Sequence, residues 1–426
     1  MTISGELYIV LFIVVCIFFF ISFFSMKVGL VLMALAMLFS PEIPVGSIGI
    51  RSIVLRMEDV LIPILLLAWL ARLSIRREFR LLALTPLNVP ILLLLGISLV
   101  STAWGFAMGR VSLLMAGFYL LKTVEFFVTF FLVVNYVRAV PQIKVFLFFA
   151  LLTVGLLGLY TLTQIPENEI FTRHRITAPF EGRPEPGTVG GYMAFLLLII
   201  LGICLYEESP RMKWLCGFLG LIVFIPFLYT LNRTSYAALI AGTLFLAFSS
   251  KKKWLVYLLI GFVFTSPFWI PPSVKERIAF TWLDAAKPGR ILGVDSSFQE
   301  RITAYEKMWR AWRFSPLIGW GVTSFQIPDS QYARTLHEIG IIGLGLWLWI
   351  FWRLFRISHW LFYRLEGGGL KGMVLGYRAG LIGILLHGFG NITFYIVRIM
   401  EPFWFLSGLV VSLYLIKIQE TSSVNP

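Results

Sequence analysis

The sequence predicts an all-α, polytopic membrane protein with about 12–14 transmembrane helices, each needing roughly 20 mostly apolar residues. Hydrophobic residues make up 58% of the 426 residues and charged residues only 14%, whereas soluble domains have roughly 45–50% and about 25%. The mean hydropathy is +0.86. This composition excludes a disordered chain, a nucleic-acid-binding domain and a conventional soluble enzyme, and it makes membrane lipid the expected surroundings.

Candidate spans follow one another along the chain, which predicts a single integral membrane domain over residues 1–426. The spans lie at about 7–25, 28–43, 57–73, 87–105, 112–136, 145–164, 188–206, 214–231, 234–249, 254–270, 337–355, 374–391 and 402–417. The second is short enough to be an incomplete crossing. The chain begins without the basic region of a cleaved signal peptide, so the first span is expected to be retained. The three cysteines, Cys16, Cys204 and Cys216, lie in apolar stretches and predict neither a disulfide framework nor a zinc site.

Basic residues indicate which ends of the spans face the cytoplasm, because cytoplasmic loops are enriched in Lys and Arg. They gather in four connections: Arg72 with Arg76, Arg77 and Arg80; Arg138 with Lys144; Lys251–Lys253; and Arg353, Arg356, Arg364 and Lys371. The span order puts all four on one face, together with the C-terminus. Segments 165–187, 231–234 and 271–336 then lie outside. The side of the N-terminus depends on whether every span before residue 87 crosses.

The outer segment 271–336 is the longest connection, and a connection of this length is usually functional or disordered. Its four tryptophans, Trp282, Trp309, Trp312 and Trp320, predict a folded cap. Apolar residues recur along 297–314 at helical spacing, which predicts an amphipathic helix on the outer surface. Ser297 and Glu300 fit a capping box at its start. Arg301 falls at the edge of the apolar face, where it either snorkels or binds an anion.

A further helix is predicted to begin near Asp329 and to enter the membrane. Asp329 occupies the position of an N-cap, so it either caps this helix or takes part in chemistry. Tyr332 lies on the same side of the helix as Asp329. His337 is expected to be structural.

Arginines also occur in the shorter outer segments. Arg173, Arg175 and Arg183 lie in segment 165–187, where they either form an anion site or pair with nearby glutamates. Arg233 lies in the tight connection Asn232–Ser235, whose Thr234 and Ser235 are expected to cap the next helix. A guanidinium binds phosphate through two parallel hydrogen bonds and stays charged. Since no metal-binding motif is present, arginine would have to carry any positive charge that the chemistry needs.

Two pairs of opposite charges lie within the spans. Lys122 and Glu125 are three residues apart, as are Arg398 and Glu401, and each pair is expected to form an ion pair on one helix face. His387 lies in a glycine-rich stretch, where close packing of helices is expected.

Four segments together resemble a known family. They are RITAPFEGRPEPGTVGGYMA at 175–194, LNRTSYAALIAG at 231–242, ERITAYEKMWRAWRFSPLIGWGVTSF at 300–325 and DSQYARTLHEIGIIG at 329–343. In this order around a long outer loop, they are similar to segments of the O-antigen ligases and bacterial polysaccharide polymerases, which are membrane glycosyltransferases.

The resemblance implies a GT-C-like fold and an active site on the outer face of the bacterial cytoplasmic membrane. The family takes an oligosaccharide from a polyprenyl diphosphate and needs no nucleotide sugar, metal or other cofactor. Carried over by position, Arg233 and Arg301 would hold the diphosphate, and Asp329 would be a general base or orient a neighbouring group. The residues expected to bind substrate are Arg175, Arg183, Tyr332 and Trp309.

The resemblance favours a polymerase over a ligase. The ligases have a His-Asn pair where this chain has Asp329 and Ser330. A ligase that transfers a finished glycan to a lipid or protein acceptor remains an alternative, as does a transporter or lipid flippase. A chain-length regulator protein is a candidate partner of the polymerase.

Overall fold

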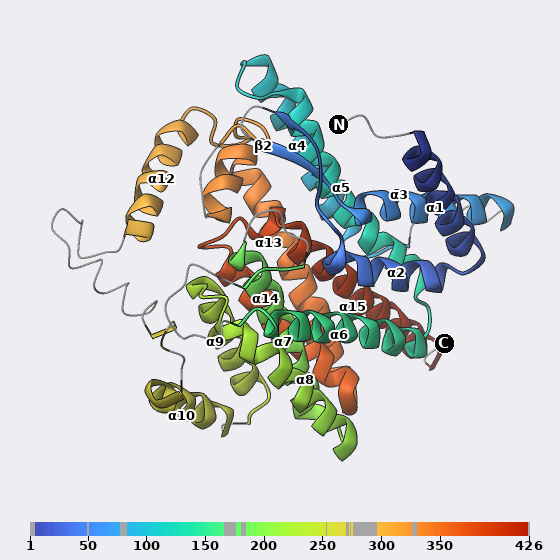
Figure 1. The fold of residues 1–426 in the computed structure, drawn as a ribbon, viewed down its shortest axis with the longest axis vertical. Helices are drawn as coiled ribbons and strands as arrows, with labels where there is room; N and C mark the ends of the chain where they lie inside the picture. Colours follow the sequence, from blue (N-terminus) through green and yellow to red (C-terminus); the bar gives the residue numbers. More distant parts are fainter. Residues whose placement is uncertain are drawn as a thin grey trace.

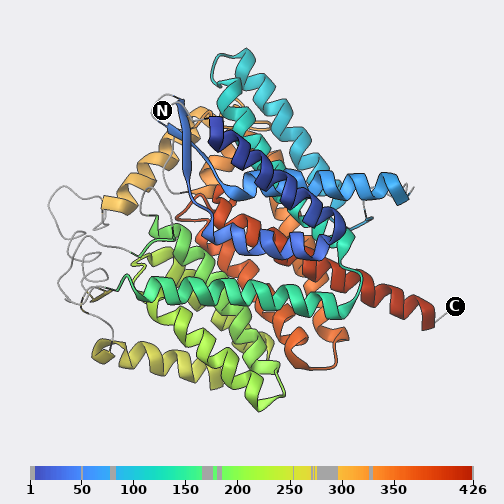
Figure 2. The same ribbon diagram turned by 45° about the vertical axis from the view of Figure 1, so that its right-hand side comes forward.

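The fold is known from a computed structural model, and its helices form one bundle (Figure 1). The structure describes residues 5–48, 51–76, 83–165, 176–179, 185–252, 254–269, 272, 274–275, 296–325 and 330–424. Helices α1 to α3 gather on the side of the N-terminus, and α7 to α10 lie on the opposite side (Figures 1 and 2).

Every span predicted from the sequence is a helix in the structure. The helices are α1 (Gly5–Phe24), α2 (Met26–Phe39), α3 (Met57–Arg76), α4 (Asn88–Ala107), α5 (Leu113–Tyr136), α6 (Val140–Leu162), α7 (Pro186–Tyr206), α8 (Pro210–Leu228), α9 (Arg233–Ser249), α10 (Trp254–Trp269), α12 (Ser296–Trp312), α13 (Gln331–Arg364), α14 (Gly368–His387) and α15 (Val397–Val424), with a 3-10 turn η2 (Thr393–Tyr395). Among the described residues, 8 of these helices are long and apolar enough to cross a membrane. The chain is therefore a multi-pass membrane protein.

A short antiparallel hairpin between α2 and α3 departs from the predicted run of helices. It consists of β1 (Ile43–Ile48) and β2 (Arg51–Leu55). Pro41 and Pro44 prevent α2 from continuing, because proline lacks the amide hydrogen that a helix interior uses. The isoleucines and valines that follow suit extended strands.

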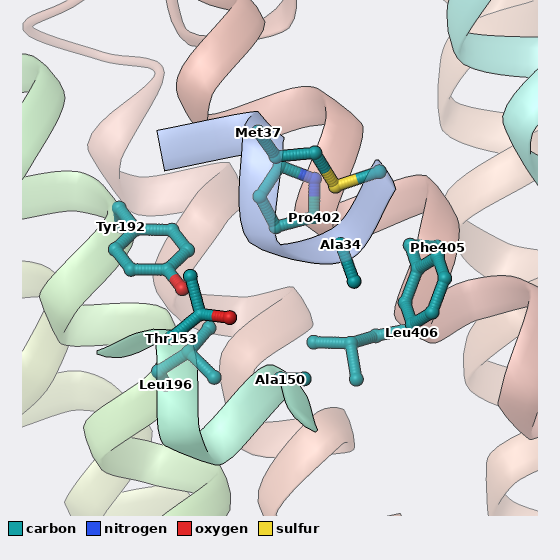
Figure 3. Close-up of a pocket in the computed structure, with 9 residues that line it drawn as sticks. All are labelled: Ala34, Met37, Ala150, Thr153, Tyr192, Leu196, Pro402, Phe405 and Leu406. Atoms are coloured by element: carbon teal, nitrogen blue, oxygen red, sulfur yellow. The ribbon is translucent and has the colours of Figure 1, made fainter. Parts of the chain in front are cut away.

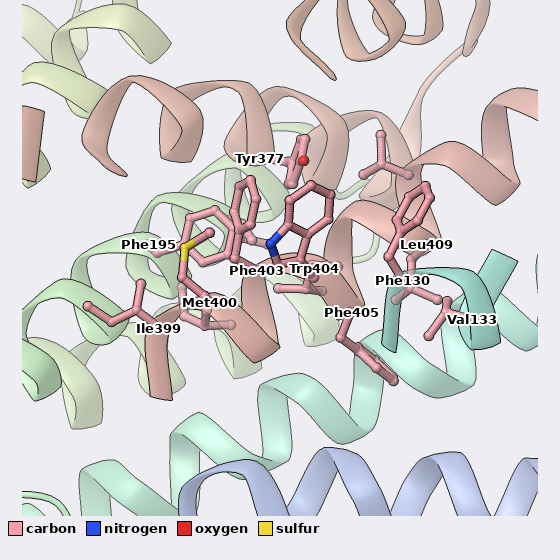
Figure 4. Close-up of a cluster of buried hydrophobic side chains, with 14 of the residues drawn as sticks. Phe130, Val133, Phe195, Tyr377, Ile399, Met400, Phe403, Trp404, Phe405 and Leu409 are labelled. Atoms are coloured by element: carbon pink, nitrogen blue, oxygen red, sulfur yellow. The ribbon is translucent and has the colours of Figure 1, made fainter. Parts of the chain in front are cut away.

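The core of the bundle is built around α7, whose most apolar stretch is 89% buried. Figure 4 shows the aromatic layer beside it, where Phe195 of α7 meets Tyr377 of α14 and Phe403 of α15. Trp404 fills the space between Phe403 and Phe130 of α5. Aromatic packing of this kind joins segments that are far apart in the sequence.

Glycines allow α7 and α14 to approach each other closely. A Cβ atom on Gly202 of α7 would lie 2.4 Å from the carbonyl oxygen of Gly372, and one on Gly376 of α14 would lie 2.5 Å from that of Leu198. Small residues at such contacts let backbones pack in a membrane, where apolar burial between helices gives little driving force.

We therefore expect Gly376→Ala to destabilise the protein by about 1–3 kcal/mol, because the new methyl group overpacks a backbone contact. Thermal unfolding in detergent measures the effect as a lower midpoint. Gly217→Ala on α8 is the control, since a Cβ there meets no atom within 4 Å. Equal midpoints for the two variants would contradict the close approach.

A small cavity lies where α2, α6, α7 and α15 meet. Figure 3 shows Met37, Thr153, Tyr192 and Pro402 among the side chains around it. The space open to the centre of a water molecule is about 10 Å³, which is roughly enough for one water. A sugar or a lipid does not fit there, so a site for a large substrate must lie elsewhere.

Candidate functional site

Helices α7, α9 and α13 all begin at one place, around the C-terminal end of α14. We call this place the junction and define it as residues 185–188, 232–235, 330–332 and 387–395. The amide of Gln331 donates to the carbonyl oxygen of Gly388 (2.9 Å). A Cβ atom on Gly187 would lie 2.6 Å from Oδ1 of Asn391 and 3.0 Å from Nδ2 of Asn232. These contacts bring together three segments that the sequence placed on one face.

Asn232 caps α9 and thereby fixes Arg233 as the first residue of that helix. Its Oδ1 accepts hydrogen bonds from the amide of Ser235 (3.0 Å) and from the hydroxyl of Thr234 (2.5 Å). The expectation that Thr234 and Ser235 cap the helix is therefore wrong, because the asparagine one position before the helix reaches these donors first. Arg233 is half-buried at this helix start.

Asn391 and His387 tie α9 to α14. The side-chain amide of Asn391 donates to Oγ1 of Thr234 (2.5 Å) and lies 3.2 Å from Nε2 of His387. His387 is buried, and its Nδ1 lies 2.9 Å from Oγ1 of Thr393. A Cβ atom on Gly191 would lie 2.8 Å from its ring, so the expected close packing at His387 is confirmed.

The start of α13 is held by contacts with α12, α14 and η2. Ser330 caps the helix, and its Oγ lies 2.5 Å from the hydroxyl of Tyr305 on α12. The N-cap is thus one residue later than expected, at Ser330 instead of Asp329. Gln331 accepts the amide hydrogen of Phe394 (2.8 Å). Tyr332 is half-buried, donates to the carbonyl oxygen of Leu385 (2.5 Å) and packs against Phe389 with ring centroids 4.6 Å apart.

The junction favours a bound anion on electrostatic grounds. Each helix N-terminus carries about half a positive charge and presents amide hydrogens that have no partner within the helix. Helix N-termini are for this reason common phosphate sites. Arg233 adds a full positive charge. The C-terminal end of α14 carries an opposite partial charge, and Glu185 adds a negative charge at the start of α7, where its carboxylate accepts the hydroxyl of Thr188 (2.9 Å).

Below the junction, α13 is interrupted at Gly340, which has φ 67° and ψ −170°. The interruption leaves the carbonyl groups of His337 and Glu338 free to accept the amides of Trp320 and Gly321 (both 2.9 Å). Ser101 of α4 completes this contact, since its hydroxyl donates to the Glu338 carbonyl (2.5 Å) and accepts the Gly321 amide (2.9 Å). The segment after α12 is thereby fixed to α13 and α4.

A buried ion pair, which sequence reasoning missed, lies in the same part of α13. Nε of Arg334 donates to Glu338 (2.9 Å), and both side chains are almost fully buried. The other oxygen of Glu338 accepts the hydroxyl of Tyr395 (2.7 Å), and the Arg334 guanidinium lies 4.0 Å from the Tyr395 ring. The spacing of four residues on one helix could have indicated this pair.

The structure describes only some of the residues expected to act on substrate. Arg175, Arg183 and Asp329 lie outside the described residues, as does Arg173, the third arginine of the first outer segment. Arg301 belongs to α12, but its side chain also lies outside the description. Trp309 is exposed on the same helix and packs against Trp312 with ring centroids 5.0 Å apart. Arg233 and Tyr332 both lie at the junction.

A second group of charges lies where the start of α3 meets α5 and α15. We call it the charge cluster, and it comprises Glu58, Asp59, Lys122, Glu125 and Glu401. The expected pair of Lys122 and Glu125 is confirmed at 3.2 Å, and Lys122 also pairs with Asp59.

The expected pair of Arg398 and Glu401 is wrong. Arg398 pairs instead with Glu42 (3.8 Å) and donates to the carbonyl oxygens of Leu38 (3.4 Å), Ser40 (3.2 Å) and Pro179 (3.0 Å). These partners come from distant segments, which the local spacing on α15 does not reveal.

Comparison with known proteins assigns no function to the residues at the junction. No protein-family model matches the sequence, and no curated protein matches it either. The function must therefore be argued from the residues at the junction and from their chemistry.

Proposed function

We propose that this protein is a membrane glycosyltransferase that polymerises oligosaccharide repeat units carried on a polyprenyl diphosphate. The reaction would take place at the outer face of a bacterial cytoplasmic membrane. The observation that supports this proposal is the meeting of three helix N-termini with Arg233 at one end of the bundle. Such a site suits the diphosphate of a lipid-linked donor.

The chemistry that this site offers is charge stabilisation. Breaking the bond between sugar and phosphate leaves additional negative charge on the lipid diphosphate. Positive groups that are already fixed in place stabilise this charge without reorganising, which makes them effective in catalysis. Arg233 and the helix starts provide such groups, with Arg301 as the second proposed guanidinium.

The remaining proposed roles concern the acceptor and the lipid. Asp329 would accept the proton of the acceptor hydroxyl or would orient an arginine. Arg175, Arg183, Trp309 and Tyr332 would bind the glycan and the lipid. Positioning the acceptor against the donor would supply the rest of the rate enhancement, because it removes the entropic cost of a reaction between two molecules.

Arg233→Ala is expected to lower the polymerisation rate about 10²–10³-fold, the usual cost of removing one group that stabilises transition-state charge. The assay uses purified protein in nanodiscs with lipid-linked oligosaccharide from its host and excess EDTA, and it resolves the products by size. The unmodified protein should give a ladder of repeat numbers.

The control is Arg211→Ala, which removes an exposed arginine from the N-terminal end of α8, the end away from the junction. Both variants should accumulate in the membrane, and the control should keep the ladder. A normal ladder from Arg233→Ala would refute the proposal. If a product formed only after a second acceptor was added, the protein would be a ligase.

A transporter or flippase is the second candidate, because the charge cluster places ionisable groups inside the membrane helices. Such groups commonly mark ion or proton pathways. A transporter would leave the lipid-linked donor chemically unchanged in the nanodisc assay. Consumption of the donor without a transmembrane gradient would exclude this candidate.

A further inference from the structure

The charge cluster contains more acidic groups than basic ones. Lys122 ion-pairs with Asp59 and lies 3.2 Å from Glu125. One carboxylate oxygen from each of Asp59, Glu125 and Glu401 lies within 4.8 Å of the others. A single ammonium group therefore faces three carboxyl groups at close range.

One carboxyl group of the cluster has no hydrogen-bond partner among the described residues. Glu58 and Glu401 are both fully buried, and neither oxygen of Glu401 accepts a hydrogen bond. Both Glu58 and Glu125 repel a negative charge on Glu401, whereas Lys122 and Arg56 attract it. A buried, unpaired carboxylate is strongly unfavourable, so the cluster needs a further positive charge.

The neighbouring arginine cannot supply this charge by itself. Arg56 donates to Glu42 (2.7 Å) through Nη2, so this part of its guanidinium is engaged outside the cluster. Burial lowers the pKa of Arg56, but the hydrogen bond and charge of Glu42 and the charge of Glu58 together raise it above its ordinary value. Arg56 is therefore always charged and contributes a constant field.

A proton fits the cluster better than a metal ion does. Lys122 already occupies the position between Asp59 and Glu125 that a metal ion would need. A proton requires only one carboxyl oxygen. Carboxyl groups held as close together as Asp59, Glu125 and Glu401 cannot all ionise easily, and one of them keeps its proton.

We propose that the charge cluster is a proton-binding site in which Glu401 is held as a neutral carboxylic acid. The Glu401 carboxylate takes up a proton from water and releases it again to water, so no other reactant is needed. The site is separate from the proposed transfer of glycan and does not depend on it.

Infrared difference spectroscopy of the full-length protein in nanodiscs tests this site directly. At neutral pH, the carbonyl band of a protonated carboxyl group should be present, and it should shift in D2O. Glu401→Gln should remove this band, because glutamine has nearly the same shape but no acidic proton. Glu420→Gln, which changes an exposed glutamate on the same helix, should keep it.

Other outcomes would overturn the proposal. They are the absence of the band from the unmodified protein at neutral pH, or its persistence in Glu401→Gln. Loss of the band when Mg²⁺ or Ca²⁺ is added to EDTA-treated protein would identify a metal site instead. If Glu401→Gln does not fold, the D2O measurement on the unmodified protein and Asp59→Asn, which should change the band position, still decide the question.

Discussion

Gly340→Ala should be among the most damaging single substitutions in this protein. The φ of 67° and ψ of −170° belong to a region that essentially only glycine adopts, and other residues there cost about 1–3 kcal/mol in strain. In addition, a Cβ atom would lie 2.1 Å from the carbonyl oxygen of Leu317. Such overpacking costs typically about 1–3 kcal/mol more. We expect a large drop in the thermal midpoint in detergent, or loss of the folded protein.

Gly345→Ala provides a matched control on the same helix. A Cβ atom at Gly345 meets no atom within 4 Å, and alanine favours a helix interior by about 1 kcal/mol over glycine. This variant should be as stable as the unmodified protein or slightly more so. If Gly340→Ala behaved in the same way, the interruption in α13 would not exist in solution.

Glu338→Ala should destabilise the protein by about 3–5 kcal/mol, because removing one partner of a buried ion pair leaves the other charge uncompensated. Glu338 is fully buried and accepts hydrogen bonds from Arg334, Tyr395 and the amide of Thr323. All three donors lose their acceptor. Chemical or thermal unfolding in detergent measures the difference.

Two further variants make this prediction specific. Glu366→Ala removes an exposed glutamate just beyond the other end of α13 and should change stability little. Arg334→Met combined with Glu338→Gln removes both charges and keeps an acceptor for Tyr395. It should lose less stability than the sum of the two single changes, since partners in contact are not additive. Additive losses would show that Arg334 and Glu338 do not interact.

The sequence predicted the helices well because each span is a long apolar run, and such runs need no information about their partners. It missed the β-hairpin, which is only two short strands between α2 and α3. The interruption at Gly340 was also missed. Glycine is common in membrane helices, and only the position of Leu317 shows why it is needed here.

The candidate site was predictable in part. The order of the spans placed Arg233 and the start of α13 on one face, and the structure brings both to the junction. The charge cluster was not predictable, because Asp59, Lys122 and Glu401 come from three helices that are distant in the sequence. Spacing within one helix revealed Lys122 with Glu125, but the same reasoning failed for Arg398.

The contacts of Arg398 also set the order in which the chain can assemble. Its guanidinium holds the backbone of Leu38 and Ser40, which are 360 and 358 positions earlier in the chain. During synthesis, the end of α2 cannot form these hydrogen bonds until α15 has entered the membrane. Contacts of such long sequence separation form slowly, and incomplete chains with unpaired surfaces are prone to misassembly. The contacts at the end of α2 are therefore complete only after α15 has been made.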